Sequence, residues 1–219
     1  MGKNNLCAHC DKQKLDAMKN KKQKSNLPII LSVCAVLVVA LALVAWLTLG
    51  GDAAPEKHHV EIEIQDYGTI TVAQAAQAAP ITVENFLQLA ESGFYDGLTF
   101  HRIIAGFMMQ GGDPEGTGMG GSSTTIKGEF SSNGVENPLS HTRGAISMAR
   151  SSAYDSASSQ FFICHADSTF LDGDYACFGY VTDGMDVVDA VCAAAQPTDG
   201  NGTIAASEQP VITHIRVID

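Results

Sequence analysis

A nearly apolar stretch of the chain, FHRIIAGFMMQGGD at residues 100–113, holds one arginine and one glutamine among phenylalanines, isoleucines and methionines. A solvated loop is rarely this apolar, and a core strand does not normally hold an unpaired guanidinium, because burying a lone charge is costly. Arg102 and Gln110 therefore indicate a polar site within an apolar surface. A guanidinium held in such a place can donate a hydrogen bond to a reacting group.

Two later stretches, GAISMARSS and SSQFFICHADSTFLDGDYACFG, combine apolar and polar residues in a similar way. Because side chains alternate along a strand, Phe100 and Arg102 are predicted to share one strand face. By the same argument, Gln160, Phe162 and Cys164 are predicted to share one face of another strand. One face of such a sheet would pack the interior, and the other would display arginine, glutamine and phenylalanine.

The remaining motif-like patterns favour other chemistries only weakly. GTGMGG at residues 116–121 matches G-x-G-x-x-G, but no predicted strand enters it and no helix follows, so a flexible glycine loop is preferred to a dinucleotide site. The serines of SSAYDSASSQ lie outside any G-x-S-x-G motif. His58, His59 and His165 lack metal-ligand spacing and are interpreted as surface or hydrogen-bonded structural residues. Neither a metal nor a cofactor is expected.

The elements predicted around these stretches are short strands and two helices. Alternating apolar residues at 60–72 predict a hairpin that turns at 66–68. The stretch PITVENFLQLAESGFY predicts a helix with Thr82 as its N-cap and Gly93 at its end. Helical spacing of apolar residues predicts a second helix at 185–194. The whole pattern favours a mainly antiparallel β domain that is closed by its last strand.

The chain also divides sharply by charge. Residues 1–26 carry seven lysines against two aspartates, a net +5, whereas residues 27–219 carry six basic against twenty-two acidic side chains, a net −16. The run LPIILSVCAVLVVALALVAWLTLG at 27–50 has no charge. As a helix it reaches roughly 36 Å, which is enough to cross a hydrocarbon core of about 30 Å. We therefore predict a transmembrane anchor, with a cleaved signal peptide as the alternative.

The lysines before this span place the N-terminus in the cytosol, because positive charge stays on the inner side of a membrane. A basic cytosolic tail (1–26), a single-pass anchor (27–50) and a linker (51–57) then precede an extracytosolic domain (58–219). The acidic charge of that domain gives no basis for a nucleic-acid partner.

The cysteines do not form a recognisable framework. CAHC at residues 7–10 is half of a zinc site without a second pair on the same side of the membrane, so two reduced thiols are preferred, with a half-site completed by another chain as the alternative. Cys164, Cys177 and Cys192 are an odd number and are predicted to be small buried residues without a disulfide framework.

Taken together and in order, these stretches resemble the cyclophilin family of peptidyl-prolyl cis/trans isomerases, in a bacterial, membrane-anchored form. The resemblance extends over about residues 60–217 and includes GFYDGLTFHRII, GFMMQGGDPEGTG, SQFFI and LDGDYACFG. It implies an eight-stranded antiparallel closed barrel capped by two helices, with an outer groove that binds proline-containing polypeptides. The expected reaction is rotation about X-Pro bonds, which requires no nucleophile, metal or cofactor.

The resemblance also implies roles for individual residues. Arg102 matches the catalytic arginine, and Gln110 and Phe107 act with it. The matching substrate-binding positions are Met108, Gln160, Phe162, Leu171, Ala149, Arg150, Phe170 and Tyr175. Taken singly, each apolar residue of this set can also be interpreted as a core residue, and Arg102 as a surface residue. The prediction therefore depends on the ordered combination of all of them.

The sequence departs from the best-known eukaryotic members at Phe170 (tryptophan there), Tyr175 (histidine), Arg150 (asparagine) and Ala105 (proline). Because Phe170 lacks an indole N–H, weak cyclosporin binding is expected. The predicted function is isomerisation that assists the folding of exported proteins at the outer surface of the cell membrane. A peptide-binding or holdase module that uses the same groove with little turnover is the alternative.

Overall fold

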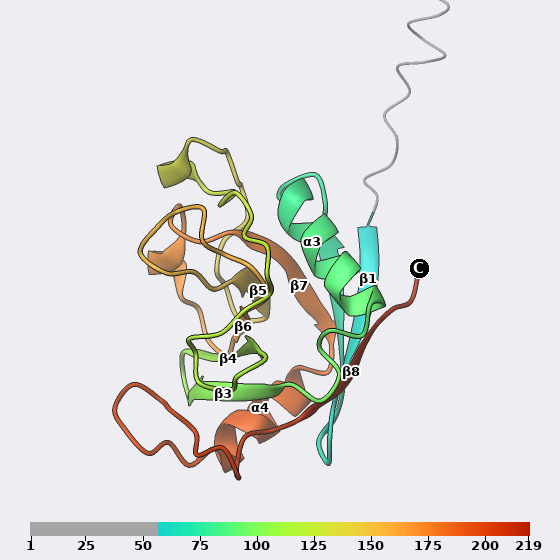
Figure 1. Ribbon diagram of the computed structural model, residues 1–219, viewed down its shortest axis with the longest axis vertical. Helices are drawn as coiled ribbons and strands as arrows, with labels where there is room; N and C mark the ends of the chain where they lie inside the picture. The colour runs from blue at the N-terminus through green and yellow to red at the C-terminus, as the bar shows by residue number, and fades with distance from the viewer. Residues whose placement is uncertain (1–56) are drawn as a thin grey trace, which may run out of the picture. The chain divides into compact units, whose positions relative to one another are not determined.

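The computed structural model describes residues 57–219, which form eight strands and two α-helices (Figure 1). The elements are β1 Lys57–Ile64, β2 Gly68–Ala75, α3 Pro80–Glu91, β3 Thr99–Ile104, β4 Met108–Asp113, the 3-10 helix η1 Ser131–Asn133, β5 Ala145–Met148, β6 Phe161–Cys164, the 3-10 helix η2 Thr169–Leu171, β7 Cys177–Asp183, α4 Met185–Ala194 and β8 Ile212–Val217. The predicted tail, anchor and CAHC pair lie outside the described residues. Within 57–219 no helix has both the length and the apolar character needed to span a membrane.

All eight strands belong to one antiparallel sheet in the order β3-β4-β6-β5-β7-β2-β1-β8. The ladder does not close, because β3 and β8 are its edges, so the sheet is an open half-barrel and the predicted closed barrel is wrong. Isolated bridges join β3 to the segment between α4 and β8, one between Arg102 and Thr203 and one, just before β8, between Thr99 and Val211. Pro210, beside that bridge, lacks the N–H that a longer ladder would need.

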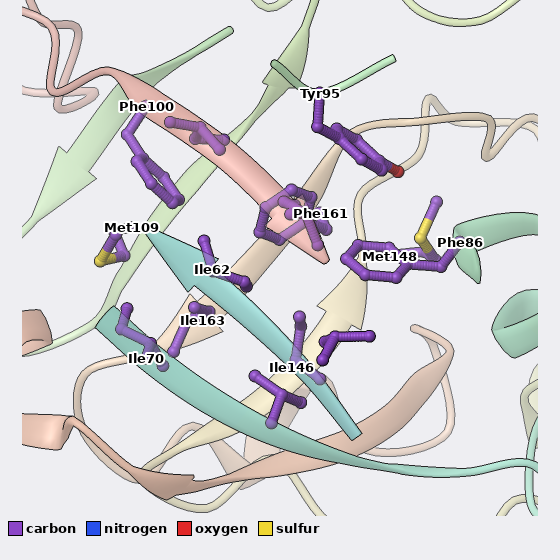
Figure 2. Packing of buried hydrophobic residues seen from close by; sticks show 14 of the residues in the cluster. Ile62, Ile70, Phe86, Tyr95, Phe100, Met109, Ile146, Met148, Phe161 and Ile163 are labelled. Atoms are coloured by element: carbon purple, nitrogen blue, oxygen red, sulfur yellow. The ribbon is translucent and has the colours of Figure 1, made fainter. Parts of the chain in front are cut away.

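The concave side of the sheet is filled by the main apolar core, part of which is drawn in Figure 2. Ile62 and Ile70 enter it from the predicted hairpin, and Phe161 and Ile163 enter from β6. Phe86 of α3 packs edge-on against Phe161, with 5.4 Å between ring centroids. The helices α3 and α4 pack beside β8 and β2 respectively, which buries their apolar faces.

The start of α3 differs from the prediction. The helix begins at Pro80 with Ala79 as its N-cap, so Thr82 is not the N-cap. Instead, the carboxylate of Glu129 accepts the backbone N–H groups of Ile81 and Thr82 over 3.1 and 2.8 Å, and the Thr82 hydroxyl over 2.7 Å. A buried side chain 47 residues away in sequence therefore satisfies the free N–H groups of the first turn. The second helix, α4, has the predicted bounds.

A bulge in β3 changes which face of the sheet the later side chains of this strand occupy. Phe100 pairs with Gly111, but Arg102 pairs with the adjacent Gln110, so His101 is an extra residue in the ladder. A bulge of this kind reverses the alternation of side chains that follows it. Phe100 is fully buried in the core, whereas Arg102 lies on the other face, and the prediction that they share a face is wrong.

The cysteines of the described region are as predicted. Cys164, Cys177 and Cys192 are free and buried. Burial raises the pKa of Cys164 and of Cys177 to about 12, and that of Cys192 to about 11. All three are therefore protonated at neutral pH and act as small packing residues.

Candidate active site

A second apolar cluster lies on the face of the sheet opposite the core. Met108 and Phe162 are almost fully buried in it, at 1% and 5% exposure. The partly buried residues packed around them include Phe107, Leu171 and Tyr175. The alternation along β6 produces this arrangement, since Phe162 and Cys164 face the second cluster while their neighbours face the core.

Aromatic rings form the rim of this cluster. The Phe107 ring lies 5.6 Å from that of Phe170, which is 71% exposed. Tyr175 packs edge-on against Phe162 at 6.0 Å. The result is an apolar surface cluster with one exposed aromatic side chain beside it, a surface that suits a small apolar ring.

Arg102 is anchored beside this cluster through two of its nitrogens. Its Nε donates to the carbonyl of Asn201 over 2.7 Å, and one terminal nitrogen donates to Oε1 of Gln110 over 3.3 Å. The same terminal nitrogen lies 3.7 Å from the sulfur of Met108, and the guanidinium carbon lies 5.9 Å from the centre of the Phe107 ring. The guanidinium is thus held in one orientation next to the apolar cluster.

Partial burial lowers the pKa of Arg102 from its ordinary value, while Tyr175 and Asp199 act in the opposite direction. An arginine remains a cation at neutral pH even with such a shift, because its ordinary pKa is above 12. The site therefore presents a fixed positive donor group in a partly desolvated position, where a hydrogen bond is stronger than in water.

A chain of hydrogen bonds continues from the guanidinium. Gln110 accepts from Arg102 and donates through Nε2 to Oε1 of Gln160 over 2.9 Å. Gln160 in turn donates to the carbonyl of Gly120 over 2.7 Å. These contacts orient both amides and tie the strands of the site to the glycine loop at 116–121.

The glycine loop is itself organised by one carboxylate. Asp113 accepts the backbone N–H groups of Glu115, Thr117 and Gly118 over 2.6 to 3.0 Å. Burial alone would raise the pKa of Asp113, but these N–H groups outweigh it and hold the pKa below its ordinary value. The loop borders a cleft of about 310 Å³ whose lining includes Gln110, Gln160, Ala149, Arg150 and Met119.

Arg150 is held at the edge of this cleft by aromatic rings. Its guanidinium carbon lies 5.1, 5.1 and 4.8 Å from the ring centres of Phe130, Tyr154 and Tyr175. Its nitrogens donate to the carbonyls of Asp174 and Ser151, both over 2.9 Å. Cation–π contacts and carbonyl acceptors thus set the position of this side chain.

The structure brings all the predicted site residues into one region, on β3, β4, β6, the turn between β3 and β4, and the segments that follow β5 and β6. Their proposed roles in binding and catalysis remain predictions.

Sequence reasoning missed the acceptor that anchors Arg102, which is the carbonyl of Asn201. Asp199 shapes that loop by accepting the N–H groups of Asn201 and Thr203, each over 3.0 Å. A TDGNGT stretch has the composition of a turn but gives no sign of what it contacts.

Sequence reasoning also missed a buried histidine that packs against the second apolar cluster. His141 is 1% exposed and stacks on Phe162, with 5.9 Å between ring centroids. Its Nδ1 lies 2.7 Å from Asp172, and its Nε2 lies 3.0 Å from the Ser147 hydroxyl. Burial lowers the pKa of His141, although Asp172 acts in the opposite direction. The His141 ring therefore packs against Phe162 and helps to fix its position.

Comparisons with known proteins agree with this geometry. The family model described as cyclophilin type peptidyl-prolyl cis-trans isomerase matches residues 59–217. The chain is 46% identical over 126 residues to a peptidyl-prolyl cis-trans isomerase of Helicobacter pylori, covering 57% of this chain and 74% of that one. It is 48% identical over 123 residues to peptidyl-prolyl cis-trans isomerase B of Bacillus subtilis, covering 56% and 82%. It is 38% identical over 195 residues to peptidyl-prolyl cis-trans isomerase A of Dickeya dadantii, covering 85% and 97%.

A solved structure is also similar to this chain. It is the crystal structure of a Cryptosporidium parvum cyclophilin type peptidyl-prolyl cis-trans isomerase in the presence of the dipeptide Ala-Pro. The TM-score is 0.65 and the sequence identity is 31%, and the match covers 74% of this chain and 99% of that chain.

Proposed function

The chain belongs to the cyclophilin-type peptidyl-prolyl cis-trans isomerase family and is an enzyme of that class, and on this premise we propose that Arg102 is its catalytic residue. Its substrates are proline-containing polypeptides, in line with the dipeptide Ala-Pro in whose presence the Cryptosporidium structure was solved. The proline ring binds against the second apolar cluster, at Phe107, Met108, Phe162 and Leu171. Gln110, Gln160 and the backbone at Ala149 and Arg150 hold the flanking peptide, and Phe170 and Tyr175 border it.

The chemistry explains the need for an arginine. An amide resists rotation by roughly 18 to 20 kcal/mol, because the nitrogen lone pair is delocalised into the carbonyl. As the bond twists, the prolyl nitrogen becomes pyramidal and regains that lone pair, which a guanidinium N–H can then contact. The planar ground state lacks this acceptor, so the interaction strengthens only towards the transition state and raises the rate. To shorten the isomerisation step from about 100 s to about 1 ms, the enzyme must lower the barrier by roughly 7 kcal/mol.

One observation carries this proposal: the guanidinium is fixed by Asn201 and Gln110 beside the second apolar cluster. A preorganised donor does not need to reorient when the prolyl nitrogen changes shape. No covalent step is involved, and the prolyl ring can stay on this cluster while the preceding carbonyl turns.

The experiment that tests the proposal measures cis-trans exchange of an Ala-Pro peptide with the full chain and with Arg102→Ala. The parent should accelerate exchange and the variant should lose most of that acceleration, while both bind the peptide. A parent that binds the peptide without accelerating exchange would support the alternative, a peptide-binding or holdase module.

We further propose that the isomerase acts on exported proteins at the outer surface of the cell membrane, anchored by residues 27–50. The support is the sequence alone: an uncharged span preceded by seven lysines and followed by a strongly acidic domain. Protease added to wall-free intact cells should then degrade residues 58–219 and spare the tail. Protection of the domain until lysis would reverse the orientation, and domain found free in the medium would indicate a cleaved signal peptide.

A further inference from the structure

A histidine just after β6 holds the turn that joins β3 to β4. In this turn the N–H of Phe107 donates to the carbonyl of Ile104 over 2.9 Å, with Ala105 and Gly106 between them. The N–H of Gly106 donates to Nδ1 of His165 over 2.8 Å. The backbone N–H of His165 donates to the carbonyl of Phe107 over 2.9 Å. One residue therefore contacts two consecutive residues of the turn.

The other side of the imidazole faces a carboxylate. Nε2 of His165 lies 3.1 Å from Oδ1 of Asp189 on α4. Arg143 donates to both carboxylate oxygens of Asp189 over 2.8 and 2.9 Å, and to the carbonyl of His165 over 2.6 Å. Because the Gly106 N–H can donate only to an unprotonated Nδ1, the contact requires a neutral ring with its proton on Nε2, facing Asp189.

The turn leads into the groove. Phe107 packs against the second apolar cluster, and its ring lies beside both the Arg102 guanidinium, at 5.9 Å, and the Phe170 ring, at 5.6 Å. Gly106 has a φ of +80°, a conformation that glycine adopts readily, and an added Cβ there would have no heavy atom within 4 Å. The hydrogen bonds of His165, together with the backbone hydrogen bond from Phe107 to Ile104, hold this turn and therefore the position of Phe107.

We propose that His165 is a positioning residue for the isomerase groove, and that its protonation makes the rate of isomerisation depend on pH. The neutral imidazole accepts from Gly106 and holds Phe107 against the groove. When Nδ1 takes a proton it can no longer accept, two N–H groups face each other, and the turn moves away. The inference rests on the proposed function, because it assumes that Phe107 lines the substrate site.

The charged groups around the imidazole come from three segments. Asp189 on α4 contacts the imidazole itself; Arg143 before β5 donates to the His165 carbonyl and to Asp189, and Asp167 accepts the backbone N–H of Arg143 over 2.8 Å. The turn itself, residues 103–107, has no charged side chain. Histidine is the side chain that changes charge between pH 5 and 8, whereas carboxylates and guanidinium groups ordinarily keep their charges there.

Two amide substitutions test the roles of the two ring nitrogens of His165 separately. His165→Asn places an oxygen acceptor near the position of Nδ1 and carries no titrating proton. His165→Gln reaches towards the position of Nε2 and leaves the Gly106 N–H without its acceptor. His214→Asn is the matched control, since Nδ1 of His214 also lies 3.1 Å from a carboxylate, that of Glu63, but on β8 and away from the groove.

The rate is measured with the full chain between pH 8 and pH 5, by NMR exchange on a terminally blocked Ala-Pro peptide without titrating side chains. We expect kcat/KM of the parent to fall roughly twofold to tenfold on acidification, the range that one lost hydrogen bond gives. His214→Asn should show the same fall. His165→Asn should keep the parent's pH 8 rate at both pH 8 and pH 5, and His165→Gln should have the parent's lower, pH 5 rate at both pH values.

The amide signal of Gly106 supplies a second readout that does not depend on activity. It should shift with pH in the parent and in His214→Asn, and should not shift in His165→Asn. A fall in rate that persists in His165→Asn, or equal rates for the Asn and Gln variants, overturns the inference while the proposed function stands. A parent that accelerates no exchange at any pH overturns the proposed function itself, whatever Gly106 shows.

Discussion

Arg102→Lys is expected to lower kcat/KM by about 10²-fold, although it keeps the positive charge. In the structure, Nε is anchored by the carbonyl of Asn201 at 2.7 Å and a terminal nitrogen by Gln110 at 3.3 Å. Lysine has a single nitrogen on a flexible stem and cannot make both contacts while remaining beside the second apolar cluster. Loss of one preorganised donor generally costs 10² to 10³ in rate, about 2.7 to 4 kcal/mol. Arg102→Ala, which removes the donor altogether, should reach about 10³-fold.

The same substitutions should change stability little. Asp199 holds the loop around Asn201 through its own contacts with two backbone N–H groups and the Thr203 hydroxyl, and none of these involves Arg102. Because Arg102 is only partly buried, water can replace its contact with the Asn201 carbonyl. We expect a loss of about 1 kcal/mol or less, which corresponds to a shift of about 2 to 4 °C in Tm for a domain of this size.

The assay compares cis-trans exchange rates, far-UV circular dichroism and melting curves of the parent and the Arg102 variants. Arg216→Ala is the matched control, because this arginine is bound to Asp96 through two hydrogen bonds on β8, away from the groove. It should leave kcat/KM unchanged. Full activity of Arg102→Ala would refute the mechanism, and a large fall in Tm together with activity would make Arg102 a structural residue instead.

Three further predictions concern stability and inhibition. Glu129→Ala should destabilise the fold by about 2 to 3 kcal/mol in urea unfolding, because two N–H groups of α3 and the Thr82 hydroxyl lose a buried acceptor; a change under 0.5 kcal/mol would show that water replaces it. Burial lowers the pKa of His101 and of His141 in the folded state, so the unfolded chain binds more protons. Stability should be fully present above about pH 6.5 and fall as the pH drops below it, and a flat urea midpoint from pH 7 to 5 would contradict this. Phe170→Trp should tighten cyclosporin binding by roughly tenfold or less in calorimetry, since one neutral hydrogen bond contributes about 0.5 to 1.5 kcal/mol; tight binding by the parent would show that Phe170 is not limiting.

Local patterns in the sequence predicted the elements whose faces are set by neighbouring residues. The hairpin of β1 and β2, the helix α4 and the shared face of Phe162 and Cys164 all follow from simple periodicity, and the structure confirms them. The apolar positions of the second cluster were predicted for another reason. Each of them alone resembles a core residue, and only the resemblance of several ordered motifs placed them together in one cluster.

Features that depend on distant contacts could not be predicted in this way. The bulge at His101 shifts Arg102 to the face opposite Phe100, and nothing in FHRII signals an extra residue. The N-terminal turn of α3 is capped by Glu129, 47 residues from Thr82, so a local capping rule selected the wrong residue. The open edge between β3 and β8 depends on where two strands far apart in the chain meet.

The polar half of the site was the hardest part to predict, because its acceptors are main-chain groups. Arg102 is oriented by the carbonyl of Asn201, and Gln160 by that of Gly120. Every residue has a carbonyl, so no side-chain pattern identifies the few that face a guanidinium or an amide. A motif can therefore name the catalytic arginine, but the direction in which its N–H groups point is set by a loop about 100 residues further along the chain. For a reaction whose acceleration depends on where one N–H points, that loop belongs to the active site as much as the arginine does.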